Sequence, residues 1–245
     1  GRHTESIYYS FFKKILVTLQ AKRNHAMIEI INFDDRPSLV SVYMSELRDV
    51  TVQKDPLRFR TNLERIGQIM AYEISRRMEY RACEVTTPLG TATCHKPAAE
   101  PVLATIMRAG IPFHQGFLSY FDYAENAFVS AYRRYKEKGD SFDVLIEYLA
   151  SPDIEGKTLI IADPMLATGA SMELAYKALL SKGEPAHIHV ASVIASRQAV
   201  DYICSVFPQE KTTVWCGAID AEINAHSYII PGLGDAGDLS YGKKL

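Results

Sequence analysis

Apolar and polar positions along the chain fall into two alternating patterns. Between residues 57 and 78, apolar side chains recur every three or four positions, which is the stripe of an amphipathic helix. Strand-like apolar runs come later, at 102–107, 127–132, 158–162, 188–195 and 212–219. Segments suited to helices lie between several of them, at 112–120, through Leu174, Ala178 and Leu179 to an end near Gly183, and at 197–207.

This alternation of strand and helix predicts an α/β fold with a mostly parallel central sheet flanked by helices. The continuously apolar run 158–162 is typical of a strand that is buried on both faces. Two short strands are also expected at 84–87 and 91–94, joined as a hairpin through Pro88, Leu89 and Gly90.

The first 26 residues follow a different pattern. They combine aromatic side chains, lysines and a short apolar run at 15–19, without a small-residue cleavage site. We interpret 1–26 as a leader, an expression remnant or an additional helix of unknown role, and we assign 27–245 to a single domain.

Composition and charge narrow the function. The 245 residues are 47% apolar and 23% charged, which is an ordinary globular balance. A net charge of -2 gives no global basic field for nucleic acid, so an anion site must be built locally. No run reaches the about 20 apolar residues that a membrane helix needs. Four cysteines without CxxC spacing predict neither a zinc site nor a disulfide framework, and we expect a cytoplasmic protein.

The sharpest local feature is the loop that follows the apolar run 158–162. Asp163 is followed within a few positions by small residues, and a helix comes next. Small side chains let successive backbone N–H groups converge on a phosphate at the helix N-terminus. The residues of this loop are Pro164, Met165, Leu166, Ala167, Thr168, Gly169, Ala170 and Ser171.

The loop is neither a Walker loop, because no GxxxxGK[ST] is present, nor a dinucleotide fingerprint, because GxGxxG is missing. The carboxylate of Asp163, directly before the cradle, suits the hydroxyls of a ligand whose phosphate lies in the loop. A sugar phosphate fits this pattern.

Four motifs, in this order along the chain, resemble those of the uracil phosphoribosyltransferases, a branch of the type I phosphoribosyltransferases. They are Met107-Arg108-Ala109-Gly110, Ala131-Tyr132-Arg133, the loop from Asp163 to Ser171, and Tyr228-Ile229-Ile230-Pro231-Gly232-Leu233-Gly234-Asp235-Ala236-Gly237-Asp238. Pro164 stands where most type I enzymes carry a second acid, as is the habit of the uracil branch. Ala170 replaces the family's usual glycine, and 134–140 lacks its common acidic run.

The resemblance implies the type I fold with a C-terminal hood and a charged β-hairpin flap around Arg133. It also implies a pyrimidine-salvage reaction, in which uracil and 5-phosphoribosyl 1-diphosphate (PRPP) give UMP and diphosphate. By resemblance, Arg108 and Arg133 contact the diphosphate, Asp163 binds the ribose, and 167–171 hold the 5-phosphate; the PRPP-binding set also includes Pro164, Met165, Leu166 and Asp235.

The base is expected to lie against Ile229, under Tyr228, and to be read by the backbone of Gly234 and Ala236, with Asp235 beside it. Asp235, Arg108 and Arg133 are the candidate catalytic residues, and Asp235 is also the candidate base for uracil N1. The implied cofactor is Mg²⁺, held by PRPP without a direct protein ligand and reached by Asp235 through water. Expected partners are further copies of the chain, as a dimer or larger homo-oligomer, and an allosteric nucleotide such as GTP.

Two other functions stay open at this point. One is a type I phosphoribosyltransferase for another base, a purine or orotate, although the C-terminal motif favours uracil. The other is a non-catalytic regulator that senses PRPP or UMP, which the presence of Arg108, Asp163, Thr168 and Asp235 argues against.

Overall fold

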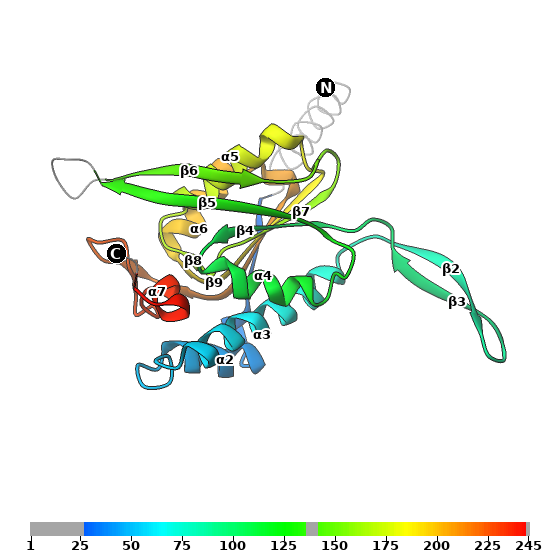
Figure 1. The fold of residues 1–245 in the computed structure, drawn as a ribbon, viewed down its shortest axis with the longest axis horizontal. Helices are drawn as coiled ribbons and strands as arrows, with labels where there is room; N and C mark the ends of the chain where they lie inside the picture. Colours follow the sequence, from blue (N-terminus) through cyan, green and yellow to red (C-terminus); the bar gives the residue numbers. More distant parts are fainter. Residues whose placement is uncertain (1–26, 136–141, 244–245) are drawn as a thin grey trace, which may run out of the picture.

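The computed structural model describes residues 27–135 and 142–243, and its centre is an eight-stranded sheet with strand order β1-β10-β9-β7-β4-β5-β6 and β8 paired with β9 (Figure 1). All pairs in this sheet are parallel except β5 with β6, as the continuous apolar runs predict. The strands are β1 (Glu29–Asn32), β4 (Val102–Met107), β5 (Glu125–Tyr135), β6 (Phe142–Ala150), β7 (Thr158–Ala162), β8 (Met165–Leu166), β9 (His187–Ser196) and β10 (Thr212–Asp220).

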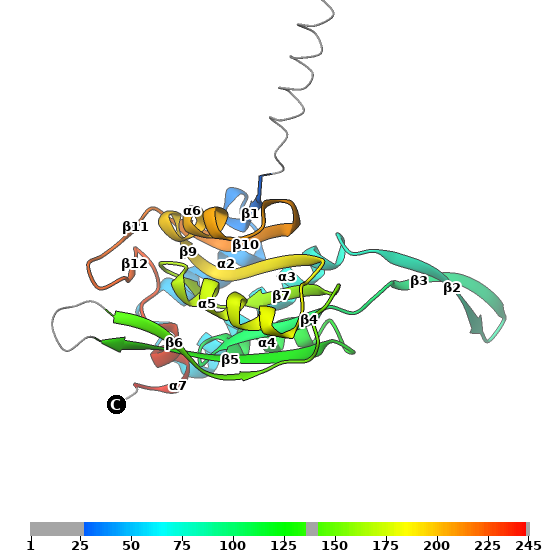
Figure 2. The ribbon, with the colours of Figure 1, turned by 90° about the horizontal axis from the view of Figure 1, so that it is seen from above.

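Helices cover both faces of the sheet (Figures 1 and 2). One hydrophobic core joins α2, α3, α4 and the C-terminal segment to the first face, and a second core joins α5 and α6 to the other face. The helices are α2 (Leu39–Arg48), α3 (Pro56–Ser75), α4 (Gly110–Leu118), α5 (Ala170–Leu179), α6 (Arg197–Val206) and α7 (Ala236–Tyr241), with short 3-10 turns η1 (Phe33–Asp35), η2 (Leu180–Lys182) and η3 (Gln209–Lys211).

The long helix α3 begins and packs as its sequence predicts. The carboxylate of Asp55 accepts hydrogen bonds from the N–H groups of Leu57 and Arg58, and Pro56 occupies the first helical position. The predicted apolar stripe is buried against the sheet, apart from the partly exposed Ile69. In α5, by contrast, Met172, Ala175, Tyr176 and Leu179 are buried, whereas Leu174 and Ala178 of the expected face are only partly buried.

The predicted hairpin is confirmed and is longer than expected. Strands β2 (Tyr80–Thr87) and β3 (Gly90–Pro97) pair antiparallel and project from the body as an arm (Figure 2). The sequence patterns did not predict β1, α2, β6 or the short C-terminal pair β11 (Glu222–Ile223) and β12 (Ile229–Ile230).

Two expectations concern residues that lie outside those described: the extension 1–26 and the tip of the charged hairpin at 136–141. The assignment of 27–245 to one domain stays a prediction. Within the described part of the chain, no helix is both long enough and apolar enough to span a membrane.

Parallel strands bring their carboxyl ends to one edge of the sheet. The loop with Arg108 follows β4, the loop with Asp163 follows β7, and Asp220 ends β10. The C-terminal segment with β12 and α7 lies at the same edge (Figure 1). This is the edge where ligands bind in open α/β sheets.

A buried histidine on β9 gives the fold a pH-dependent stability. The Trp215 Nε1–H donates to Nδ1 of His189 at 3.1 Å, and both rings are buried. Burial, with smaller contributions from His187 and Arg77, lowers the pKa of His189 to about 3. The folded protein therefore holds this ring neutral, whereas the unfolded chain binds a proton below its ordinary pKa of about 6.5.

We therefore expect protonation of His189 in the unfolded chain to lower the free energy of unfolding by about 2 kcal/mol as the pH falls from 7 to 5. The free energy of unfolding, measured by urea titration at both pH values, should fall less in His189→Gln than in the wild type. Equal decreases in the two proteins would contradict this assignment.

Candidate active site

The loop from Asp163 to Ser171 leaves the sheet at β7 and enters helix α5. Its first part is held against β9, because the N–H of Asp163 donates to the Ala191 carbonyl at 3.1 Å and β8 pairs with β9. The Asp163 carboxylate accepts the Met165 N–H at 3.2 Å. The side chain is thereby fixed at the mouth of the loop.

The turn into α5 depends on Gly169. Its φ is +84°, and a Cβ at this position would lie 2.8 Å from Cδ1 of Tyr202. Both the backbone conformation and the close approach therefore favour glycine. Ala170 begins α5, and Ser227 is the only non-glycine with positive φ among the described residues, so alanine at 170 is accommodated without strain.

This loop encloses a small hollow at the N-terminus of α5. Most of the expected PRPP-binding residues of this loop line it, but Pro164 and Ala170 do not; the lining residues are Asp163, Met165, Leu166, Ala167, Thr168, Gly169, Ser171 and Met172. Free N–H groups at the start of a helix and its dipole favour an anion in such a place. The structure thus supports an anion cradle here.

Arg108 lies at the carboxyl end of β4 and reaches the C-terminal segment. Its guanidinium donates to the Asp238 carboxylate at 3.1 Å and to the Gly242 carbonyl at 3.3 Å. The side chain of Arg108 is 39% exposed, so this pair leaves part of the guanidinium open to a ligand. Asp238 belongs to the C-terminal motif, but no sequence pattern predicts its pairing with Arg108.

Asp235 caps the short helix α7. Its carboxylate accepts the Asp238 N–H at 2.9 Å, which places Asp235 and the partner of Arg108 on one turn. A Cβ on Gly237 would lie 3.2 Å from Oδ1 of Asp235 and 3.5 Å from Nη2 of Arg108. The structure therefore brings Arg108 and Asp235 together.

A contact between Met165 and Ala236 joins the two main motifs directly. The N–H of Ala236 donates to Sδ of Met165 at 3.3 Å; Ala236 belongs to the first hydrophobic core, and the partly buried Met165 packs against it. We call residues 231–235, which join β12 to α7, the C-terminal loop. A ligand in the hollow at Thr168 and a ligand at the C-terminal loop would therefore occupy neighbouring places on one edge of the sheet.

The expected base-binding residues differ in exposure. Tyr228 is 43% exposed, Gly234 is exposed with a φ of +91°, and Ala236 is buried. Ile229 is buried in β12, where its side chain is part of the first core. Arg133 lies in β5 opposite Val144, and its side chain is outside those described.

The sequence did not reveal the residues whose side chains hydrogen-bond to the backbone of the C-terminal loop. Arg48 in α2 forms a two-pronged ion pair with Asp220 at the end of β10, and Asp220 also accepts the Gly232 N–H. Gln53 donates to the Leu233 carbonyl at 3.2 Å. No local signal could have found these contacts, because 172 positions separate Arg48 from Asp220.

Comparison with known proteins gives consistent matches. The family model described as uracil phosphoribosyltransferase matches residues 36–243. A uracil phosphoribosyltransferase of Porphyromonas gingivalis is 63% identical over 218 residues, which are 89% of this chain and all of the relative. One from Methanothermobacter thermautotrophicus is 40% identical over 191 residues, covering 77% of this chain and 86% of the relative.

A solved structure shares the fold over most of its length. The AQ2163 protein from Aquifex aeolicus superposes with a TM-score of 0.76 at 27% sequence identity. The superposition covers 87% of this chain and 98% of the solved one. The arrangement of sheet and helices described above is therefore similar to that of a known structure.

Proposed function

The chain belongs to the uracil phosphoribosyltransferase family, and from this premise we propose how its own residues carry out the transfer. The activity is pyrimidine salvage, in which uracil and PRPP give UMP and diphosphate. The observation that carries the site assignment is that Arg108, Asp235 and the hollow at Thr168 meet at one edge of the sheet.

The reaction exchanges one bond at the anomeric carbon of the ribose for another. The bond from C1 to the diphosphate oxygen breaks, the bond from C1 to uracil N1 forms, and uracil gives up its N1 proton. Positive charge grows on the ribose ring and negative charge on the leaving diphosphate. Groups already placed at these charges lower the barrier, and holding both substrates in line supplies proximity.

The hollow at the start of α5 holds the 5-phosphate of PRPP. The backbone from Ala167 to Ser171 supplies N–H donors, and the hydroxyls of Thr168 and Ser171 add to them. The carboxylate of Asp163, which lines the same hollow, accepts the ribose hydroxyls. Pro164, Met165 and Leu166 shape the loop between them.

Arg108 and Arg133 receive the diphosphate. A guanidinium offers paired donors that match phosphate oxygens, and its charge stabilises the leaving group as the bond breaks. The 39% exposed Arg108 is already oriented by Asp238, so little reorganisation is needed.

Phosphoribosyltransferases generally use Mg²⁺ with PRPP, and the residues present fit an ion carried by the substrate. Among the described residues, no three acidic, histidine or cysteine side chains gather in one place. Mg²⁺ keeps several of its waters when it is bound through substrate phosphates, and the carboxylate of Asp235, beside Arg108, would accept a hydrogen bond from one of these waters. When bound, the ion neutralises part of the diphosphate charge.

Uracil lies at the C-terminal loop, between Tyr228 and the backbone of Gly234 and Ala236. Main-chain groups suit a small planar base whose edge alternates donors and acceptors. Ile229 supports this loop from the core. Asp235 is the base for the N1 proton, because its carboxylate is the acidic group within this part of the loop.

The function is tested by following diphosphate release with PRPP, Mg²⁺ and uracil, cytosine, orotate, hypoxanthine or adenine, with identification of the nucleotide. We expect UMP from uracil alone. A purine nucleotide or orotidylate would assign another base. Saturable Mg²⁺-dependent binding of PRPP without any turnover would favour a sensor of PRPP or UMP.

Replacing Asp235 with asparagine should lower kcat by about 10²-fold or more, since a general base contributes about 10² to 10⁴-fold. Asparagine caps helices as well as aspartate does, so α7 and the fold are expected to persist. PRPP affinity, measured by calorimetry, should stay within about threefold of the wild type. Unaffected turnover would remove Asp235 from the mechanism.

We also propose that the protein is a cytoplasmic homo-oligomer and that a nucleotide such as GTP regulates it. Light scattering at the assay concentration tests whether the protein is an oligomer, and a monomer would refute this part of the proposal. Initial rates with and without GTP test the second statement, and identical rates would refute it.

A further inference from the structure

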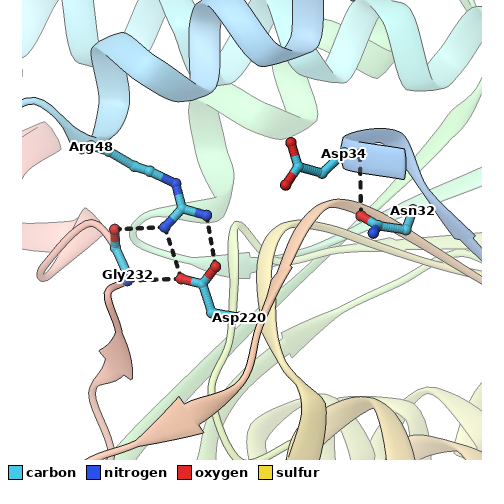
Figure 3. A network of polar contacts seen from close by, with 5 residues as sticks. All are labelled: Asn32, Asp34, Arg48, Asp220 and Gly232. Atoms are coloured by element: carbon cyan, nitrogen blue, oxygen red, sulfur yellow. Dashed lines mark hydrogen bonds and ion pairs between the residues drawn. The ribbon is translucent and has the colours of Figure 1, made fainter. Parts of the chain in front are cut away.

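A largely buried ion pair joins the end of α2 to the end of β10, beside Gly232 of the C-terminal loop (Figure 3). Nη1 and Nη2 of Arg48 donate to the two carboxylate oxygens of Asp220 at 2.8 and 2.7 Å. This is the two-pronged geometry that gives an arginine-carboxylate pair its directional strength. The planes of both groups are therefore fixed by each other.

The same pair holds both backbone polar groups of Gly232. Its N–H donates to Oδ2 of Asp220 at 2.8 Å, and its carbonyl accepts from Nη1 of Arg48 at 3.1 Å (Figure 3). Gly232 is buried and has a φ of +61°. Its position is consequently set by two side chains from elements distant in sequence.

Burial makes these contacts costly to break. The Asp220 side chain is only 8% exposed and that of Arg48 is 27% exposed. Burial alone would raise the pKa of Asp220, but the hydrogen bonds from Arg48 and Gly232 outweigh it and the pKa is lowered. The hydrogen bond to Asp220 raises the pKa of Arg48, and the nearby charge of Asp34 contributes (Figure 3). Both groups therefore stay charged.

Gln53 makes the next contact along the loop. Its amide nitrogen donates to the Leu47 carbonyl at 2.8 Å and to the Leu233 carbonyl at 3.2 Å, so it bridges the end of α2 to the C-terminal loop. A Cβ on Gly234 would lie 4.0 Å from Oε1 of Gln53. Arg48, Asp220 and Gln53 together thus bind the backbone of Gly232 and Leu233, and Gln53 also lies close to Gly234.

We propose that Arg48, Asp220 and Gln53 are positioning residues for uracil, which hold the backbone of the C-terminal loop in the conformation that reads the base. Within the described part of the chain, none of the three lines the phosphate hollow, and none is joined to Arg108 by a hydrogen bond or ion pair. This inference rests on the proposed function, in which the backbone at Gly234 and Ala236 binds uracil. It adds a structural origin for base affinity in a part of the chain that none of the recognised motifs includes.

The first test is Gln53→Ala, which removes no charge. We expect the KM for uracil to rise about tenfold, while kcat at saturating uracil and the KM for PRPP stay within about twofold; tenfold equals about 1.4 kcal/mol. A merely structural role would lower the melting temperature and the active fraction without separating the two KM values. Equal changes in both KM values, or none, would overturn the proposal.

The second test is a double-mutant cycle with Arg48→Gln, Asp220→Asn and both changes together. Arg48→Gln leaves the buried charge of Asp220 unpaired, and Asp220→Asn leaves the partly buried charge of Arg48 unpaired, so each should raise the KM for uracil more than Gln53→Ala does. The double variant should raise it less than the product of the two single effects. Strictly multiplicative effects would show that the pair does not act as a unit and would contradict the proposal.

The matched control is Arg58→Gln. Arg58 also pairs with a carboxylate across α2 and α3, that of Glu46, but it is 49% exposed, and among the described residues no hydrogen bond or ion pair joins it to the loop. We expect its two KM values to equal those of the wild type, and a selective rise for uracil would overturn the assignment. Should Arg48→Gln fail to fold, Gln53→Ala still decides the question.

Failure of the proposed function is distinguishable from failure of this inference. If the wild type forms a nucleotide from another base, the uracil assignment is wrong, and the KM for that base replaces the KM for uracil in every comparison. If the wild type forms UMP and the variants show no selective loss of uracil affinity, only the positioning role is wrong.

Discussion

Replacing Arg108 with alanine should lower kcat by about 10³-fold, which is the upper part of the range for removing one donor to a developing negative charge. The charge on the leaving diphosphate grows in the transition state, so the loss should fall on kcat more than on the KM for PRPP. Steady-state rates with saturating uracil and varied PRPP measure both constants.

The stability of the fold should change little in this variant. Arg108 and Asp238 are 39% and 31% exposed, and pairs of this kind contribute at most about 1 kcal/mol. Arg76→Ala is the matched control, because Arg76 pairs with Glu73 on the surface of α3. Its kcat should equal that of the wild type. A kcat near the wild-type value in Arg108→Ala would exclude this side chain from stabilising the diphosphate.

The central strands β4, β7, β9 and β10 were predictable because they are buried on both faces. β4 and β7 have the predicted bounds, since each is a run of five or six mostly apolar residues, a length that favours a buried strand over a helix. Helix α3 was predictable from one long stripe with an N-cap and a proline at its start. In each of these elements, local pattern and tertiary environment agree.

Short or half-exposed elements were not predictable in the same way. α2 keeps only Val40, Met44 and Leu47 buried, and β11 and β12 contain two residues each. Such segments take their structure from what they pack against, which a local pattern does not contain. β6 likewise depends on its antiparallel pairing with β5.

The parts of the candidate site also differ in how far the sequence predicts them. The hollow at Gly169 is built from consecutive residues, so its chemistry could be deduced from the order of small and polar side chains. The contact of Met165 with Ala236 and the pair of Arg108 with Asp238 join segments 71 and 130 positions apart. Only the parallel sheet, which collects strand ends at one edge, brings them together.

Gly232→Ala should produce the other large effect, a fall of more than 10²-fold in kcat/KM for uracil. A Cβ at this position would lie 2.1 Å from the backbone oxygen of Ile229, and the φ of +61° already disfavours any L side chain. The backbone must therefore move by about 1 Å, a displacement that can cost about 10²-fold in rate at a site. We expect the affinity for PRPP to fall far less, because the phosphate hollow lies on another loop.

Gly156→Ala is the control that separates the steric clash of a Cβ with nearby backbone from the strain of a positive φ. Gly156 has nearly the same φ, +68°, but no atom lies within 4 Å of the Cβ that alanine would add. The free energy of unfolding of this variant should fall by only about 1 to 2 kcal/mol, which is the cost of an alanine in the left-handed conformation, and its kcat/KM should equal that of the wild type. Gly232→Ala should lose about 3 kcal/mol or more, because the crowded backbone adds to the same strain. Similar stabilities and similar kcat/KM values in the two variants would show that the loop at Gly232 tolerates displacement, and that base binding does not depend on its conformation.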